Sequence, residues 1–185
     1  MHGQTPYTMF KRYFSIFCLF TLFVSCDKLD ELTKFDMEYS QRATIPSSTG
    51  INLPFDIFTP EMETNSESKF AVNDTRKDLI EEITLTELEL VIISPDTADF
   101  SFLNSIEVYI SADGLEEIQI ASLSEVPEDA GNRITLNTSD TDLKEYIKKD
   151  EFSLRLNTVT DELMSADHEL EVNSTFFVDA KILGL

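Results

Sequence analysis

The stretch SIEVYISADGLEEIQIAS, residues 105–122, decides the fold class of this chain of 185 residues. Apolar and polar residues alternate on both sides of the dipeptide Asp113-Gly114. Alternation with a period of two is typical of a β-strand with one buried face, and Asp-Gly between two such runs indicates a tight hairpin turn. The stretch therefore predicts two antiparallel strands, 105–111 and 116–122, joined by a turn at residues 112–115.

The same alternation recurs along the chain and predicts further strands. Residues 51–58 place Ile51, Leu53, Phe55 and Ile57 on one face. Pro54 cannot donate a ladder hydrogen bond, so this strand is expected at the edge of a sheet. The other strands are expected at residues 34–40, 88–93 (apolar on both faces and therefore central), 133–137, 151–157 and 168–182.

Two short helices are expected between the strands. The first covers residues 74–82, with Asp74 or Thr75 as its cap, and the second covers residues 139–149, where Ser139 and Asp142 resemble a capping box. Leu143, Tyr146 and Ile147 share one face of the second helix, which would cross over one end of the domain. Loops are expected at residues 47–50 and 63–68. These elements predict an all-β fold, an antiparallel immunoglobulin-like β-sandwich of seven or eight strands in one domain, residues 34–185.

The beginning of the chain has the three parts of a secretory signal. Lys11 and Arg12 precede an uncharged apolar run, residues 13–24. Spanning a bilayer takes about 20 apolar residues, so this run is too short for a membrane span and predicts a signal peptide, residues 1–25. Met9 fits as the initiator, because Met-Phe-Lys-Arg directly precedes the run.

The end of this segment, Leu22-Phe23-Val24-Ser25-Cys26, resembles the lipobox of bacterial lipoproteins. Phe23 departs from the family, which usually has leucine there. The resemblance implies cleavage by signal peptidase II, lipidation of Cys26, an acidic tether at residues 26–33 and a lipid anchor in the outer membrane. The alternative is an ordinary signal peptide, or an uncleaved anchor, with a chance cysteine.

The sequence does not decide in which membrane leaflet such a lipid anchor would lie. Residues 27–31 partly resemble the lysine-plus-acid tag that sends some Bacteroidetes-type lipoproteins to the cell surface, although Leu29 interrupts the tag. A simple charged tether explains the same residues. In enterobacteria, an aspartate directly after the cysteine, as Asp27 is here, would instead indicate retention at the inner membrane.

Charge and cysteine content exclude several classes of protein. Cleavage before Cys26 would leave 12 basic residues against 35 acidic ones, a net charge of −23. Such a field repels nucleic acid, keeps the domain soluble and favours a monomer. Because Cys18 would leave with the signal, the single remaining cysteine could form no disulfide within the chain.

The sequence offers little for catalysis or metal binding. His168 would be the one histidine of the mature chain and is expected at the surface, at the end of a strand; no serine lies in a Gly-x-Ser-x-Gly elbow. Weak calcium binding at loop carboxylates is the one metal hypothesis, at Asp96, Asp99, Asp140 and Asp142. No cofactor and no transition-metal site are expected.

Three functions remain in order of preference. The first is a non-catalytic, lipid-anchored lipoprotein that binds a protein partner or serves assembly, with strand 51–58 as the edge that accepts a strand. The second is a carbohydrate- or polymer-binding accessory module of an outer-membrane uptake system. Tyr109 would be its ligand platform because it points to a polar face, whereas Tyr39 and Tyr146 belong to the core. An enzyme is third.

Overall fold

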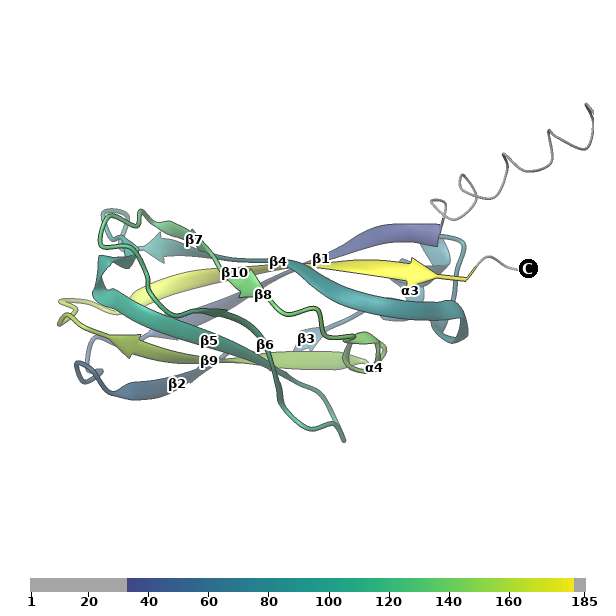
Figure 1. Ribbon diagram of the computed structural model, residues 1–185, viewed down its shortest axis with the longest axis horizontal. Coiled ribbons are helices and arrows are strands. Elements are labelled where there is room, and N and C mark those ends of the chain that lie inside the picture. Colours follow the sequence, from purple (N-terminus) through teal and green to yellow (C-terminus); the bar gives the residue numbers. More distant parts are fainter. Residues whose placement is uncertain (1–32, 182–185) are drawn as a thin grey trace, which may run out of the picture.

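The computed structural model describes residues 33–181, which form two antiparallel sheets packed face to face (Figure 1). The four-stranded sheet has the order β1 (Lys34–Ile45), β10 (His168–Ala180), β4 (Ile80–Ser94) and β7 (Arg133–Thr135). The six-stranded sheet has the order β2 (Pro54–Phe58), β9 (Glu151–Thr160), β5 (Leu103–Ser111), β6 (Ile118–Leu123) and β8 (Asn137–Thr138), with β3 (Met62–Glu63) also pairing with β9. The predicted β-sandwich is confirmed. Its strand count is higher than expected because three of the strands have only two or three residues.

Strand alternation builds the core between the sheets. Along β1, every second side chain from Met37 to Ile45 is buried, and the residues between them are exposed. The Tyr39 ring packs edge-on against Phe152 at 5.3 Å and Phe176 at 5.8 Å, centre to centre. The predicted core positions of Tyr39 and Tyr146 are confirmed, since the two side chains are 7 % and 8 % exposed.

The hairpin that decided the fold class forms as predicted. Gly114 adopts φ +72°, a left-handed conformation that side chains with a Cβ rarely adopt. The Leu115 amide donates to the Ala112 carbonyl at 3.1 Å and closes the turn. The predicted central position of residues 88–93 is also confirmed, because β4 lies between β10 and β7.

The two ends of the sandwich differ in what they carry. Lys34 pairs with Asp179 at one end, here named the terminal end, where the described chain begins and finishes. Ile45 pairs with His168 at the opposite, distal end, on the left in Figure 1. The thirteen residues of β10 span about 40 Å between the two ends.

The first predicted helix, residues 74–82, is wrong. The helix lies earlier, as α3 (Ser66–Val72), so it begins inside the expected loop 63–68. Asp74 takes a positive φ and caps no helix. A short 3-10 turn, η3 (Lys77–Leu79), follows, and β4 starts at Ile80. A second 3-10 turn, η4 (Phe100–Phe102), precedes β5.

The second predicted helix is much shorter than residues 139–149. Only α4 (Lys144–Ile147) forms, because the chain stays extended before it, where the Ser139 amide donates to the Ile120 carbonyl at 2.8 Å. The expected capping box is therefore wrong. Leu143, Tyr146 and Ile147 are buried as predicted, and α4 crosses between the sheets at the terminal end.

Two predicted strands are also revised. Segment 51–58 forms a strand only from Pro54 onward, and Ile51 makes just an isolated bridge to β9. Leu53 is 64 % exposed instead of lying on the core face. Segment 133–137 divides, because β7 joins one sheet and β8 the other. The signal peptide, Met9 and Cys26 lie outside the described residues. Residues 33–181 contain no helix that is long and apolar enough to cross a membrane.

Candidate functional site

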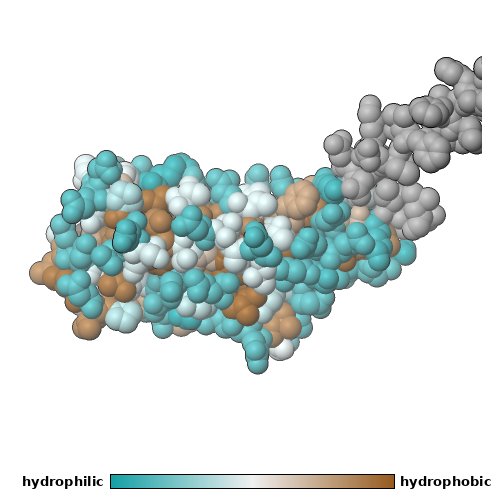
Figure 2. Space-filling view, viewed as in Figure 1, coloured by the Kyte–Doolittle hydropathy of each residue, from teal (hydrophilic) through white to brown (hydrophobic). Residues whose placement is uncertain are grey.

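Large apolar side chains lie exposed along β2 and at the distal end of the sandwich. Ile51 and Leu53 precede β2, Phe58 ends it at 66 % exposure, and Leu163, on the connection between β9 and β10, is 75 % exposed. Ile51 forms a bridge with Thr160, the last residue of β9, so the first two residues and Leu163 belong to the same end. Hydrophobic side chains gather at this end in Figure 2. Exposed apolar groups that gather in this way mark interaction sites more often than single exposed residues do.

The backbone of β2 is an open sheet edge. β9 pairs with one side of β2, and no strand within residues 33–181 pairs with the other side, which confirms the predicted edge position. The Thr59 amide donates to the Leu154 carbonyl at 2.9 Å. Because antiparallel hydrogen bonding alternates along a strand, the backbone groups of Asp56 and Phe58 point away from β9.

The other long edge, β1, has a different character. Its outward residues are polar or charged, and its inner face is tied to the segment after β2. Tyr39 donates from its hydroxyl to the Thr64 carbonyl at 2.8 Å, and Gln41 donates from Nε2 to the Pro60 carbonyl at 3.0 Å. The edge of β2 therefore combines an unpaired backbone with exposed apolar side chains, and β1 does not.

A row of four side chains crosses the outer face of the six-stranded sheet. Strand register aligns Phe58, Arg155, Tyr109 and Gln119 on β2, β9, β5 and β6. Arg155 stacks its guanidinium over the Tyr109 ring at 4.0 Å from the ring centre. The row places two aromatic residues on one exposed face, on strands that are two strand spacings, about 9.6 Å, apart.

Acidic groups hold the guanidinium of Arg155 from two sides. Its Nη2 lies 2.6 Å from Glu117 Oε1, and its Nη1 lies 2.7 Å from Asp56 Oδ1. Hydrogen bonds from Asn157 and Arg155 lower the pKa of the Asp56 carboxyl below its usual value. A hydrogen bond to Glu107, 2.7 Å long, raises the pKa of the Tyr109 hydroxyl.

The structure places Tyr109 on the outer face, with one ring face covered. The sequence hypothesis made Tyr109 a possible ligand platform on a polar face. In the structure Arg155 covers one face of the ring, and Glu107 accepts a hydrogen bond from the hydroxyl. Arg155 itself was not predicted as a site residue from the sequence. The signal that could have found it is its phase, because it is the one basic residue of β9 and lies on the polar face of that strand.

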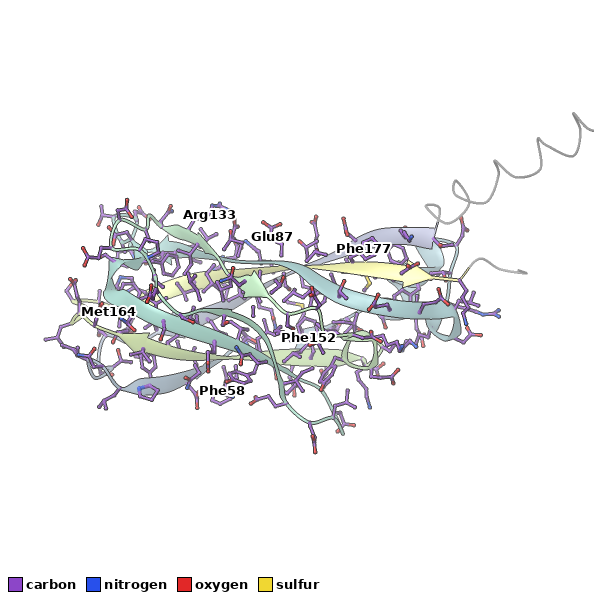
Figure 3. All side chains as sticks on the ribbon, viewed as in Figure 1. Phe58, Glu87, Arg133, Phe152, Met164 and Phe177 are labelled. Atoms are coloured by element: carbon purple, nitrogen blue, oxygen red, sulfur yellow. The ribbon has the colours of Figure 1, made fainter. Side chains whose placement is uncertain are left out.

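His168 lies deeper than expected. It does begin β10, but its side chain is 8 % exposed and its ring centre lies 4.6 Å from that of Phe102. The expected surface position is wrong because His168 is in phase with Leu170 and Val172, which point into the core. It lines a hollow of about 330 Å³ at the distal end, together with Asp99 and Met164. Figure 3 labels Met164 at this end.

The four aspartates of the calcium hypothesis occupy separate places. Asp96 and Asp99 lie on the distal connection between β4 and β5, whereas Asp140 and Asp142 precede α4. Asp99 accepts a hydrogen bond from the Ser101 amide at 3.0 Å, and Asp142 accepts from the Ile83 and Lys144 amides, each at 3.1 Å. Within residues 33–181, no three histidine, cysteine or acidic side chains gather as a metal site would require.

Comparisons with known proteins give only distant likenesses, all of them among solved structures. No protein family matches the sequence, and no curated protein matches it. Among solved structures, a carbohydrate-binding module of Clostridium perfringens (CpGH89CBM32-5), in complex with GalNAc-β-1,3-galactose, is 12 % identical, with a TM-score of 0.36 over 78 % of this chain and 97 % of that one. An acid-stable capsid structure of Helicobacter pylori bacteriophage KHP30 is 10 % identical, with a TM-score of 0.31 over 77 % and 92 % of the two chains.

A third match belongs to a study of promiscuous specificity in carbohydrate-binding modules of the β-sandwich superfamily. It is 13 % identical, with a TM-score of 0.28 over 80 % of this chain and 55 % of the other. The structural neighbours thus include carbohydrate-binding and capsid β-sandwiches. At these identities and scores they assign no ligand to this chain.

Proposed function

We propose that this protein is a non-catalytic lipoprotein of the bacterial envelope that binds a protein partner along the edge formed by β2. The observation that carries the proposal is the combination of an unpaired strand edge with the exposed side chains of Leu53 and Phe58. An extended segment of a partner would add a strand beside β2 and cover both side chains. Main-chain hydrogen bonds would give affinity, and the side chains would give specificity.

The lipid anchor complements this geometry. Lipidation at Cys26 would attach the chain through the short tether that leads to Lys34 at the terminal end. Leu53 and Leu163 lie at the distal end, about 40 Å away along β10. The exposed apolar groups would then face away from the membrane, where a partner can reach them.

Intact mass spectrometry of the membrane-extracted protein tests the anchor. The expected mass is that of the chain from Cys26 plus a diacylglycerol-based modification, and Cys26→Ala should lose both the modification and the membrane association. An unmodified mass with the protein in the soluble fraction would disprove the anchor. Protease shaving of whole cells would then separate the two leaflets, because only a surface-exposed domain is cleaved.

Photo-crosslinking in cells tests the partner site. A benzophenone amino acid at Phe58 or Leu53 should give one adduct of discrete size, while the same probe at Val72 should give none. Val72 is the matched control because it is 80 % exposed but lies on α3 at the terminal end. Equal adducts from all three positions, or no adduct from Phe58, would disprove the edge site. An adduct of twice the chain mass would show self-association and rule out a different partner.

The row across the outer sheet face favours a second function, binding of a carbohydrate. Phe58 and Tyr109 present rings on one face, and Gln119 and Asn157 offer amide groups beside them. Affinity electrophoresis against soluble polysaccharides tests it. Tyr109→Ala should abolish retardation if glycans bind here, whereas the same variant should leave the Phe58 crosslink unchanged.

A further inference from the structure

The hollow at the distal end is a second feature that could take part of a partner. It lies between the connection from β4 to β5 and the connection from β9 to β10 and measures about 330 Å³. Ala98, Phe102, Leu163 and Met164 give it apolar walls. The walls suit an aliphatic chain, and the polar groups in the hollow determine what that chain should end in.

His168 lines this hollow and has one ring nitrogen without a partner in the described chain. Its Nδ1 lies 3.0 Å from the Ala166 carbonyl oxygen, which can only accept, so Nδ1 carries the proton. In the neutral ring the other nitrogen, Nε2, then holds a lone pair. Nε2 has no hydrogen-bond partner within residues 33–181, and it is open to solvent although the residue as a whole is 8 % exposed.

The charges around the hollow have one sign. The two connections, residues 95–102 and 161–167, contain five carboxylates and no lysine or arginine. Hydrogen bonds from Ser101 lower the pKa of the Asp99 carboxyl, so this group on the wall is ionised at neutral pH. Asp167 accepts hydrogen bonds from the amide and the hydroxyl of Ser47, both at 2.8 Å. An anionic ligand would be repelled here.

We propose that the distal hollow binds a primary ammonium group on an aliphatic stem, namely a lysine side chain of the protein partner. An ammonium offers three donors, and three residues that line the hollow, His168, Asp99 and Ser101, have side chains that can accept a hydrogen bond. The methylene stem would lie against Phe102 and Met164, as long cationic side chains commonly do on apolar surfaces. This inference rests on the proposed function, because it assigns one anchoring side chain to the partner that covers the β2 edge.

A small lysine derivative tests the hollow without the partner. Nα-acetyl-lysine methylamide would be titrated into the full chain carrying ¹³C-methyl methionine. A saturable shift of the Met164 methyl signal is expected, and Met37, buried on β1, should not move. The Nε-acetylated derivative keeps the stem but lacks the charge, so it should bind at least about tenfold more weakly, which corresponds to about 1.4 kcal/mol.

Two aspartate variants serve as a matched pair. Asp99→Asn should weaken binding of the lysine derivative several-fold, while Asp96→Asn, exposed on the same connection but outside the hollow, should not. No shift of Met164, or equal binding of the two derivatives, would overturn the inference. If that happens while the Phe58 crosslink persists, the hollow is wrong and the edge site stands. If the crosslink fails while the lysine derivative binds, the proposed edge site is wrong instead.

Discussion

The guanidinium carbon of Arg155 lies 4.0 Å from the centre of the Tyr109 ring. Because Arg155 also contacts Asp56 and Glu117, one side chain links β9 to β5, to β2 and to the start of β6. A cation held by two carboxylates and an aromatic face cannot leave without exposing like charges to one another. Arg155 therefore stabilises the outer face of the six-stranded sheet, next to the edge at which a partner is proposed to bind.

Substitutions of Arg155 should destabilise the folded protein. Arg155→Ala is expected to lower the free energy of unfolding by about 1–2 kcal/mol, because it removes the cation–π contact and leaves Asp56 and Glu117 unneutralised. Arg155→Lys should recover only part of this, since an ammonium lacks the planar fork. Urea unfolding at low and high salt would measure both, and a lysine variant equal to wild type would contradict the role of the fork.

The turn glycine gives a second prediction. Gly114→Ala should lower the free energy of unfolding by about 1–2 kcal/mol, because a Cβ is strained at φ +72°. Gly131→Ala is the matched control, since a Cβ there meets nothing within 4 Å and its φ is not positive. Thermal unfolding of both variants measures the difference. Equal melting temperatures would show that the hairpin tolerates a relaxed turn.

Because of Asp142, the free energy of unfolding should decrease at acid pH. Burial raises the pKa of its carboxyl, but hydrogen bonds from Lys144 and Ile83 outweigh burial, and the net shift is downward. A depressed folded-state pKa stabilises the protein above the unfolded value of about 3.9. That contribution is lost as the pH falls from about 4 toward the folded-state pKa.

Asp142→Asn should accordingly flatten the acid side of the stability profile. Unfolding by urea would be measured between pH 7 and pH 2, with Asp140→Asn as the control, because Asp140 is exposed two residues earlier. If both variants follow the wild-type profile, Asp142 has the same environment in the folded and unfolded chain. Its hydrogen bonds to the backbone would then not persist in solution.

The buried hydroxyl of Tyr39 links β1 to the segment that follows β2 through a hydrogen bond. Tyr39→Phe removes the hydrogen bond to the Thr64 carbonyl and should cost about 1 kcal/mol, measured by urea unfolding. Tyr109→Phe is a suitable control, because its hydroxyl meets Glu107 at the exposed surface. A loss that is no greater in Tyr39→Phe than in Tyr109→Phe would indicate that water replaces the buried partner.

Alternation predicted most strands correctly because each strand has one face in the core and one in solvent. It failed at β4, where buried residues are spaced by three, two, three and two positions from Ile80 to Leu90. Two register shifts explain this spacing, since Glu81 and Thr86 have no partner on β10. A bulge inserts one residue and moves the following side chains to the other face. The strand prediction therefore covered only residues 88–93 of β4, and the predicted helix at 74–82 overlapped the start of this strand.

The candidate site was only partly visible in the sequence. Pro54 correctly predicted the sheet edge, because a proline cannot serve a central strand. The alignment of Phe58, Arg155 and Tyr109 depends on register across three strands, which a single sequence does not contain. The hollow at His168 is formed by two connections that are about sixty residues apart in the chain. The two connections lie close together because the long strands that they join are paired, and no local sequence motif predicts this.

The pairing of β1 with β10 sets an order of assembly. Lys34, near the start of the described chain, meets Asp179, near its end, and β10 is also the partner of β4. The four-stranded sheet can therefore close only after the last strand has left the ribosome. Contacts between such distant residues slow folding. For the exported lipoprotein proposed above, this delay would be an advantage, because β1 has no strand partner within residues 33–181 until β10 arrives.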